Sequence, residues 1–423
     1  MSKKTTLNAV AETAKKASLP LASASTKQKN DAIKALGSLL KKHSKAILEA
    51  NLSDIHSAKA KGLDESMIDR LSLQGNRLEG IIHDLNHIIE LPDPVGECFD
   101  RNTIGSLQIL KCRTPIGVLG VIYESRPNVT IDIAALAIKS GNCALLRGGS
   151  ETLLTNTVLV KIIQEALTKA KLPKTAVQMI PGIDREQVKK MLRLHGYIDL
   201  IIPRGGAALH QFCRDNSSIP VITGGIGICH LFVDESAHLD SSLPVISNAK
   251  VQRPTVCNAL DTLLVHESIA AKFIPQVIKA LGQQGVSFRL DDLSWKIIAR
   301  GHTKKGCIKA GPEDWDTEWL SLVLGIKVVK NLEEAIDHIH THSSGHSDGI
   351  LTENPHNASH FIKVINSAAV YINASTRFTD GGQLGLGAEV AISTQKLHAR
   401  GPMGLKELTT YKWIIKGNYT SRQ

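Results

Sequence analysis

The sequence predicts an α/β protein of two lobes, each built around a parallel, doubly wound sheet, with one small hairpin. Three observations support this prediction. Short apolar runs alternate with amphipathic stretches from residue 116 to 233, the same alternation resumes between 234 and 394, and residues 99–115 alternate polar with apolar positions. Buried strands that alternate with helices are typical of βαβ units with right-handed crossovers.

Length and composition agree with a folded protein of this class. The chain has 423 residues, of which 42% are hydrophobic and 21% are charged, and at roughly 150 residues per domain this suggests two or three domains. No apolar run reaches the roughly 18 residues of a membrane span, and the N-terminal residues lack the apolar stretch of a secretory signal. We therefore expect a cytoplasmic protein that does not bind membranes.

The formal net charge of +10 leaves two interpretations open, an ordinary basic surface or a cleft that binds anions. Only 4% of the residues are aromatic, and no helix-turn-helix or RNP-type motif is present, which argues against a nucleic-acid partner. The seven cysteines are odd in number and include no C-x-x-C pair, so the sequence predicts neither a disulfide framework nor a zinc ribbon. A small buried hydrophobe is the ordinary role of a single cysteine.

The elements follow in order along the chain. Up to about residue 91 apolar side chains recur with helical spacing, and Pro92, Pro94 and Gly96 end the helices. The hairpin at 99–115 either lies on the surface or pairs with another subunit. Strands of the first lobe are predicted at 117–123, 143–147, 176–180, 197–202, 220–222 and 228–233, with helices at 129–139, 150–170, 184–193 and 205–214. Strands of the second lobe are predicted at 261–265, 286–290, 324–330, 348–352 and 368–373.

Two glycine turns lie where strands of the first lobe end. They are Arg147-Gly148-Gly149-Ser150 and Arg204-Gly205-Gly206, and each opens a helix. Helix N-termini attract anions, and an adjacent arginine adds a bidentate phosphate donor. No G-x-G-x-x-G motif follows the first strand. The turns therefore indicate either a dinucleotide site or tight βα turns that need glycine for their geometry alone.

Two further segments carry residues suited to catalysis. A helical stretch at 241–249 leads into a turn with Arg253 and Pro254, followed by Cys257 and a buried strand. A cysteine on such a turn is a candidate nucleophile, and Arg253 is suited to hold an anion beside it. Asn128 follows the first strand of the first lobe, where its amide is suited either to donate to an oxyanion or to cap the next helix.

Six motifs give the chain a resemblance to a known family. They are ESRPNVT (124–130), LRGGSE (146–151), ITGGIGICH (222–230), QRPTVCNALDTLLV (252–265), STRFTDGG (375–382) and KLHARGPMG (396–404). Over essentially its whole length the chain resembles the γ-glutamyl phosphate reductases of the aldehyde dehydrogenase superfamily. The resemblance implies an aldehyde-dehydrogenase-like fold, with an NADP-binding domain at 1–98 and 116–233, a catalytic domain at 234–405, and oligomerisation elements at 99–115 and 406–423.

The resemblance also implies a reaction. Such an enzyme reduces L-glutamyl 5-phosphate with NADPH to L-glutamate 5-semialdehyde and phosphate, the second step of proline biosynthesis. Cys257 matches the nucleophile that forms a thioester, and its backbone N–H and the Asn128 amide match the oxyanion donors. A thioester accepts hydride more readily than an oxygen ester does, and a thiolate leaves readily, so this chemistry needs cysteine rather than serine.

The remaining site residues come from the same resemblance. Arg147, in the turn with Gly148, Gly149 and Ser150, matches a basic residue beside the adenine ribose, and a guanidinium there favours NADP. Arg204, Gly205 and Gly206 match the turn near the pyrophosphate. Glu318 resembles the carboxylate that holds the nicotinamide ribose, with a solvated carboxylate as the alternative. Arg126, Arg253 and Arg377, with Ser375 and Thr376, are the predicted substrate-binding residues.

One departure separates this chain from hydrolytic aldehyde dehydrogenases. Those enzymes carry a glutamate before a Gly-Gly pair, and Thr223 stands near that place here, which leaves phosphate as the acceptor. Another acyl-Cys aldehyde dehydrogenase, either CoA-acylating or hydrolytic, is the alternative function. No metal is expected, although His338 and His342 in a histidine-rich tract have helical i, i+4 spacing. The expected partners are further copies of the chain and glutamate 5-kinase, because glutamyl 5-phosphate is labile.

Overall fold

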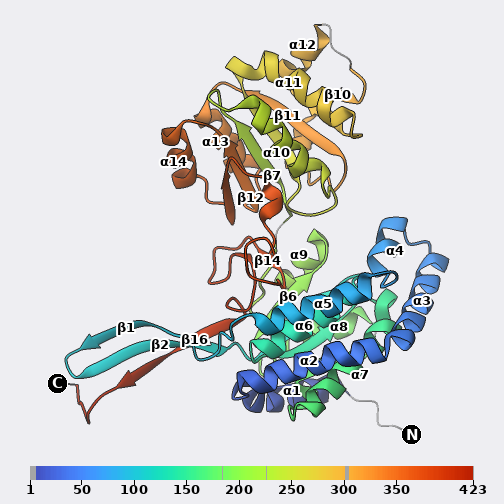
Figure 1. The fold of residues 1–423 in the computed structure, drawn as a ribbon, viewed down its shortest axis with the longest axis vertical. Coiled ribbons are helices and arrows are strands. Elements are labelled where there is room, and N and C mark those ends of the chain that lie inside the picture. The colour runs from blue at the N-terminus through green and yellow to red at the C-terminus, as the bar shows by residue number, and fades with distance from the viewer. Residues whose placement is uncertain (1–5, 183, 225, 301–303, 423) are drawn as a thin grey trace. The chain divides into compact units, whose positions relative to one another are not determined.

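Figure 1 shows a computed structural model of the chain, which describes residues 6–182, 184–224, 226–300 and 304–422. The contacts divide the chain into two compact units. Unit 1 runs from the N-terminus to residue 224 and includes 385–392 and 402–423. Unit 2 comprises 225–384 and 393–401. Each unit contains a parallel sheet, so the predicted α/β fold class is confirmed.

The N-terminal segment of unit 1 is helical, as predicted. Its helices are α1 (Leu7–Ala22), α2 (Thr26–Lys42), α3 (Ser44–Ala60), α4 (Glu65–Leu71) and α5 (Arg77–Glu90). Ser25 and Gln28 form a capping box that starts α2, and Ile33 and Leu36 on its inner face are fully buried. Both α5 and α7 pack against α2 (Figure 1).

The parallel sheet of unit 1 has the strand order β5-β4-β3-β6. The strands are β3 (Val118–Tyr123), β4 (Cys143–Arg147), β5 (Val177–Met179) and β6 (Leu200–Arg204). The connecting helices are α6 (Pro127–Lys139), η1 (Ser150–Thr152), α7 (Leu153–Lys169), η2 (Lys174–Ala176), α8 (Arg185–Met191) and α9 (Ala207–Asn216). In a parallel sheet the carboxyl ends share one edge, so the turns after β3, β4 and β6 open at the same edge.

Two strands predicted for the first lobe are placed differently. Residues 220–222 form no strand, and Val221 makes only an isolated bridge to Ile201. Residues 228–233 contain β7 (Cys229–Val233), which pairs with strands of unit 2. The prediction that 228–233 closes the first sheet is therefore wrong. A short, fully buried apolar run carries no local signal of the sheet in which it pairs.

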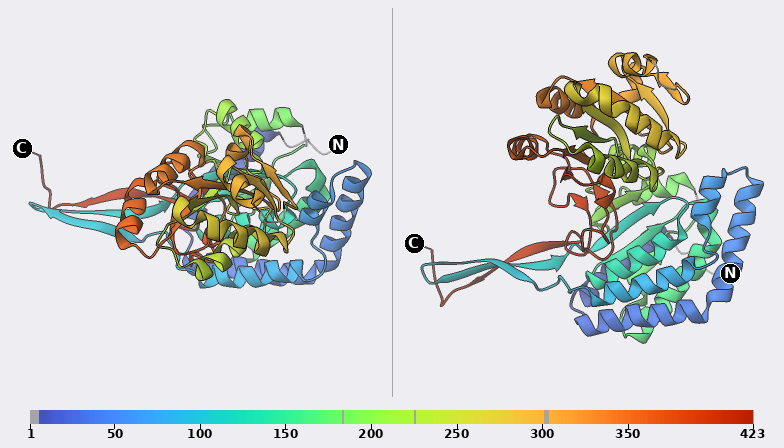
Figure 2. Two further views of the ribbon diagram at one scale, coloured as in Figure 1. Left: turned by 90° about the horizontal axis from the view of Figure 1, so that it is seen from above. Right: turned by 45° about the horizontal axis from the view of Figure 1, so that its top comes forward.

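Three antiparallel strands form a narrow ribbon in unit 1 (Figure 2). They are β1 (Cys98–Ile104), β2 (Leu107–Pro115) and β16 (Thr409–Lys416), with β2 in the centre. The predicted hairpin at 99–115 is thus confirmed, and a C-terminal strand extends it. Tyr411, Trp413 and Ile415 lie on one face of β16 and are 47%, 56% and 60% exposed.

The ribbon also corrects the expectation about the cysteines. The strand register places Cys98 directly opposite Cys112, with the Cα atoms 4.1 Å apart, and the two residues form a disulfide. The prediction of no disulfide is wrong for this pair. Register between strands decides which side chains face each other, and cysteine spacing in the sequence does not reveal that register.

The parallel sheet of unit 2 has seven strands in the order β10-β9-β11-β8-β7-β12-β13. Besides β7, its strands are β8 (Leu260–His266), β9 (Ser287–Leu290), β10 (Cys307–Lys309), β11 (Val323–Val329), β12 (Ser347–Leu351) and β13 (Ala369–Ile372). Its helices are α10 (Leu239–Val251), α11 (Glu267–Gly282), α12 (Asp292–Ala299), η3 (Pro312–Asp316), α13 (Leu332–His342), α14 (Pro355–Val364) and η4 (Thr376–Phe378). Two short strands, β14 (Ile392–Ser393) and β15 (Gly401–Pro402), lie outside this sheet and pair with each other. Within the described residues, no helix combines the length and apolar character that crossing a membrane requires.

Candidate active site

Cys257 lies on the loop that joins α10 to the central strand β8 in unit 2. The Cys257 side chain is partly accessible, whereas the other free cysteines, Cys143, Cys213, Cys229 and Cys307, are buried. Burial raises the pKa of the Cys143 and Cys213 thiols to about 12, and raises those of Cys229 and Cys307 as well. Among the free cysteines, Cys257 is therefore the best placed to react.

A second segment packs directly against this loop. A Cβ atom added to Gly227 would lie 1.7 Å from the backbone oxygen of Cys257, which no side chain tolerates. The Cys229 thiol donates to the same oxygen at 3.3 Å. The glycine in this part of the ITGGIGICH motif therefore allows close backbone approach. The motif in the sequence does not by itself indicate this role of Gly227. Gly225, in the same motif, lies outside the described residues.

Glu318 is connected to the Cys257 loop through Gly227. The Oε1 atom of Glu318 accepts a hydrogen bond from the Gly227 N–H at 2.9 Å, and the residue is half-buried. Burial raises the pKa of the Glu318 carboxyl, and the Gly227 N–H acts in the opposite direction. The carboxylate is therefore held in place, which disfavours the alternative of a freely solvated side chain.

A buried ion pair between Lys250 and Asp261 stabilises the segments that carry Cys229 and Glu318. The Asp261 carboxylate accepts from the backbone N–H groups of Cys229 at 3.3 Å and Trp319 at 3.1 Å. Lys250 lies 3.7 Å from Asp261 and donates to the Leu260 carbonyl at 2.8 Å. Burial raises the pKa of Asp261 to about 6, against the opposing charge of Lys250. Asp261 thus ties the start of β7 to the segment that carries Glu318.

The predicted substrate residues of unit 2 gather at the Cys257 loop. Ser375 caps η4 by accepting from the Arg377 N–H at 3.2 Å, and the Thr376 hydroxyl donates to the Asn258 carbonyl at 2.7 Å. Burial lowers the pKa of the Arg377 guanidinium, and the positive charge of Arg253 lowers it further, whereas Asp380 and the Cys257 thiolate raise it. The fold therefore places two arginine charges near this loop.

Asn128 and Arg126 lie in unit 1, after β3. Arg126 is the N-cap residue of α6, and Asn128 is inside the first turn, where its Nδ2 donates to Asp132 at 3.1 Å. The alternative role of Asn128 as a helix N-cap is therefore wrong. Burial raises the pKa of Asp132 to about 7. An amide nitrogen carries two hydrogens, so Asn128 keeps a second donor while Asp132 orients it.

Carboxylates of the protein itself lie close to the two glycine turns of unit 1. Glu151 accepts from the backbone N–H and hydroxyl of Ser125 at 2.7 and 2.8 Å, and Glu124 accepts from the Gly206 N–H at 3.2 Å. A Cβ atom at Gly149 would lie 2.0 Å from Glu151, and one at Gly205 would lie 2.5 Å from Glu124. An anion bound at the Gly206 N–H must therefore displace Glu124. The sequence pattern alone indicates no role for Glu124 or Glu151.

Arg147 ends β4 and is only 8% exposed. The Arg147 guanidinium donates to the carbonyl of Gly148. Burial lowers its pKa, and the nearby Glu151 carboxylate raises it. A buried guanidinium at the carboxyl end of a parallel strand is a suitable anchor for a cofactor phosphate.

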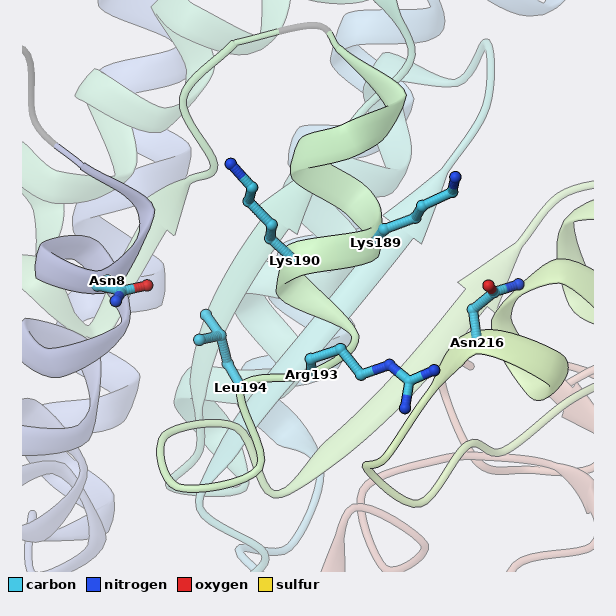
Figure 3. A pocket seen from close by; sticks show the side chains of 6 residues that line it. All are labelled: Asn8, Lys189, Lys190, Arg193, Leu194 and Asn216. Carbon is cyan, nitrogen blue, oxygen red and sulfur yellow. The ribbon is translucent and has the colours of Figure 1, made fainter.

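The histidine tract and one surface pocket lie outside these motifs. His338 is 3.1 Å from Lys327, and His342 is 2.7 Å from Asp316. No group of three or more metal-ligating side chains occurs among the residues that the structure describes. A pocket of about 400 Å³ in unit 1 is lined by Asn8, Lys189, Lys190, Arg193, Leu194 and Asn216 (Figure 3). Its three cationic side chains are exposed, and Lys189 pairs with Glu186 at 3.0 Å, so no buried polar group there specifies a ligand.

Two units with parallel sheets and an accessible cysteine beside charged groups are features of a cysteine-dependent α/β enzyme. The comparison with known families agrees. The Aldehyde dehydrogenase family matches residues 1–292, and the chain belongs to this family. Its members are oxidoreductases that use a nicotinamide cofactor. Within it, the chain is 53% identical over 423 residues to γ-glutamyl phosphate reductase of Shewanella piezotolerans, with both chains fully covered, and 52% identical to that of Vibrio parahaemolyticus, with 98% and 99% covered.

A solved structure agrees with these sequence comparisons. The crystal structure of γ-glutamyl phosphate reductase from Thermotoga maritima is 48% identical and has a TM-score of 0.95, covering 99% of this chain and 100% of its own. The chain therefore belongs with the γ-glutamyl phosphate reductases, and the resemblance stated from the motifs is confirmed.

Proposed function

We propose that the chain reduces L-glutamyl 5-phosphate to L-glutamate 5-semialdehyde and inorganic phosphate with NADPH, as the second step of proline biosynthesis. The observation that carries the proposal is the accessible Cys257 thiol on a loop beside the positive charges of Arg253 and Arg377. A nucleophile beside two guanidinium groups suits an acyl substrate whose leaving group is an anion. The full-length relatives named γ-glutamyl phosphate reductase support the same substrate.

Cys257 carries out the covalent steps. Its thiolate attacks the acyl carbon, a C–S bond forms, and the bond from carbon to the phosphate oxygen breaks as inorganic phosphate leaves with the electron pair. The result is a thioester on Cys257. A nicotinamide cofactor, when bound, would supply a hydride to the carbonyl carbon of this thioester. The C–S bond then breaks, the aldehyde leaves, and Cys257 is a thiolate again.

Both tetrahedral species on this path carry negative charge on oxygen, and fixed N–H donors stabilise such charge. We assign the Cys257 backbone N–H and the Asn128 amide to this role. The hydrogen bond from Asn128 to Asp132 supports the assignment, because it restricts the rotation of the amide. Arg126, at the N-cap of α6, is assigned to an anionic group of the substrate.

Arg147 and Glu318 are the residues that fit the cofactor. The buried Arg147 guanidinium is suited to a 2′-phosphate and so favours NADP(H) over NAD(H). Glu318 is held by the Gly227 N–H and is suited to accept from a ribose hydroxyl. Gly148, Gly149, Ser150 and the turn at Arg204, Gly205 and Gly206 complete the proposed cofactor site.

Phosphate dependence separates this function from a hydrolytic or CoA-acylating dehydrogenase. Thr223 is buried and has a hydroxyl group where hydrolytic relatives have a carboxylate, so it is a poor base for activating water. In the reverse direction, with NADP⁺ and glutamate 5-semialdehyde, we expect NADPH to form with inorganic phosphate and at most about a hundredth as fast with water or CoA. Absorbance of the reduced nicotinamide measures this rate. Equal rates without phosphate would contradict the proposal.

We also propose that the chain forms a homo-oligomer through the ribbon of β1, β2 and β16, and that it associates with glutamate 5-kinase in the cytoplasm. The exposed aromatic side chains of Tyr411 and Trp413 support the first proposal, because large exposed apolar groups favour association. Sedimentation velocity of the chain, alone and mixed with the kinase, tests both. A single 45.8-kDa species that is unchanged by the kinase would contradict them.

A further inference from the structure

Asn258, the residue after Cys257, is only 4% exposed and is connected through three groups to the segment 376–379. Its side-chain Nδ2 donates to the Thr379 carbonyl at 2.8 Å, and its Oδ1 accepts from the Arg377 guanidinium. Its backbone carbonyl accepts from the Thr376 hydroxyl at 2.7 Å. The loop of the nucleophile and the loop of Arg377 are therefore joined at one buried residue.

The Arg377 guanidinium is held at a second point. Its Nε donates to the Gln252 Oε1 at 2.8 Å, and Gln252 is the C-cap residue of α10. Gln252 precedes Cys257 in the sequence and Asn258 follows it, and both accept hydrogen bonds from the same guanidinium. Both acceptors are neutral amides, so they fix the direction of the guanidinium without cancelling its charge. These two contacts use two of its five N–H donors.

The chemistry of the proposed substrate identifies the group that this arginine meets. In an acyl phosphate the phosphate oxygen is bonded directly to the carbon that the thiolate attacks, whereas the α-carboxylate of a glutamyl group lies several carbons away. A guanidinium fixed to the loop of the nucleophile is therefore within reach of the phosphate. Arg253, which follows Gln252, brings a second positive charge to the same place.

We infer that Asn258 is a positioning residue that fixes the Arg377 guanidinium against the Cys257 loop to bind the phosphate of the acyl phosphate. The inference rests on the proposed function and assigns one of its arginines to one group of the substrate. Asparagine suits this position because it donates and accepts with one amide. Aspartate would lose the donor to Thr379 and neutralise Arg377, and alanine would lose every side-chain hydrogen bond of Asn258.

Protection of Cys257 from alkylation tests this inference without turnover. The rate of iodoacetamide labelling is measured at increasing inorganic phosphate, for the wild type and for Asn258→Ala, Gln252→Ala and Arg377→Ala. Hydrogen bonds to charged groups contribute about 1.5–3 kcal/mol, which corresponds to roughly a tenfold change or more in a binding constant. We expect the phosphate concentration for half-protection to rise about tenfold in Asn258→Ala and in the same direction in Gln252→Ala. In the reverse reaction the KM for phosphate should rise with little change in kcat.

A double variant separates positioning from a general effect on folding. If Asn258 acts through Arg377, Asn258→Ala adds less than about a twofold change when Arg377 is already alanine. Asn331→Ala is the matched control, because Asn331 caps α13 in the same unit through the Glu334 N–H at 3.0 Å. It should lower stability without changing phosphate protection.

Three results would overturn the inference. They are unchanged protection in both Asn258→Ala and Gln252→Ala, independent effects in the double variant, and weakened protection by L-glutamate instead of phosphate. Gln252 is exposed, so we expect Gln252→Ala to fold. The test can therefore still be made if Asn258→Ala does not fold. Alkylation of Cys257 requires no aldehyde, so phosphate protection can be measured even if the chain does not catalyse the proposed reaction. Failure of the proposed function would appear in the NADPH assay, whereas failure of this inference would appear in the protection assay.

Discussion

Replacing Cys257 with alanine is expected to lower the rate of phosphate-dependent NADPH formation by about 10⁴-fold or more, because removing a catalytic nucleophile has effects of this size. The other free thiols are buried, and their pKa values are raised, so none of them can substitute. Cys257→Ser should be nearly as inactive, since an alkoxide leaves less readily than a thiolate and an ester accepts hydride less readily. The rate is measured with NADP⁺, glutamate 5-semialdehyde and phosphate.

Cys307→Ala is the matched control for this experiment. Cys307 is buried in the same unit, on β10 at the edge of the sheet, three strands away from β8. We expect this variant to keep its activity within about threefold, with some loss of stability from the small cavity. Iodoacetamide should label the wild type at Cys257 and leave Cys257→Ala unlabelled. Activity of Cys257→Ala above about a hundredth of the wild-type rate would show that the thioester forms elsewhere or not at all.

Local pattern was sufficient to predict most of the fold. The buried residues of α2 recur with helical spacing, whereas β3, β4 and β8 each contain a short, continuous apolar run. These two patterns are easily distinguished in a sequence. The sheet that β7 joins could not be predicted in this way, because β7 is buried on both faces and pairs with β8 and β12 far along the chain. The Cys98–Cys112 disulfide depends on the register of the ribbon, which spacing alone does not determine.

In the candidate site, too, some residues can be predicted from the local sequence and others cannot. Cys257, Arg253 and Arg377 are reactive or charged residues in motifs, so the sequence indicates them directly. Gly227 and Asn258 carry no reactive group, and their roles arise from contacts between distant segments. Asn258 meets Thr379 across 121 positions, and Gly227 meets Glu318 across 91. Only the folded chain shows which glycine faces a backbone carbonyl and which asparagine joins two loops.

Gly227→Ala is expected to lower kcat/KM for the reverse reaction by about 100-fold or more, because small displacements of reacting groups cost about this much. The added Cβ would lie 1.7 Å from the Cys257 oxygen, 2.5 Å from its carbonyl carbon and 2.7 Å from its Cα. These are backbone atoms, so the conflict cannot be relieved by rotating a side chain. Either the Cys257 loop moves, or the 226–228 segment moves and the Gly227 N–H leaves Glu318.

The two alternatives for Gly227→Ala predict different kinetics. Displacement of the Cys257 loop lowers kcat and slows alkylation, whereas loss of the Glu318 contact raises the KM for NADP⁺. Gly311→Ala is the matched control, since a Cβ there meets nothing within 4 Å and the residue lies in the same unit. This control should match the wild type in activity and unfolding midpoint. If Gly227→Ala folds and stays within about twofold of the wild type, close packing of 226–228 on Cys257 is not required for catalysis, because a displaced nucleophile would cost far more.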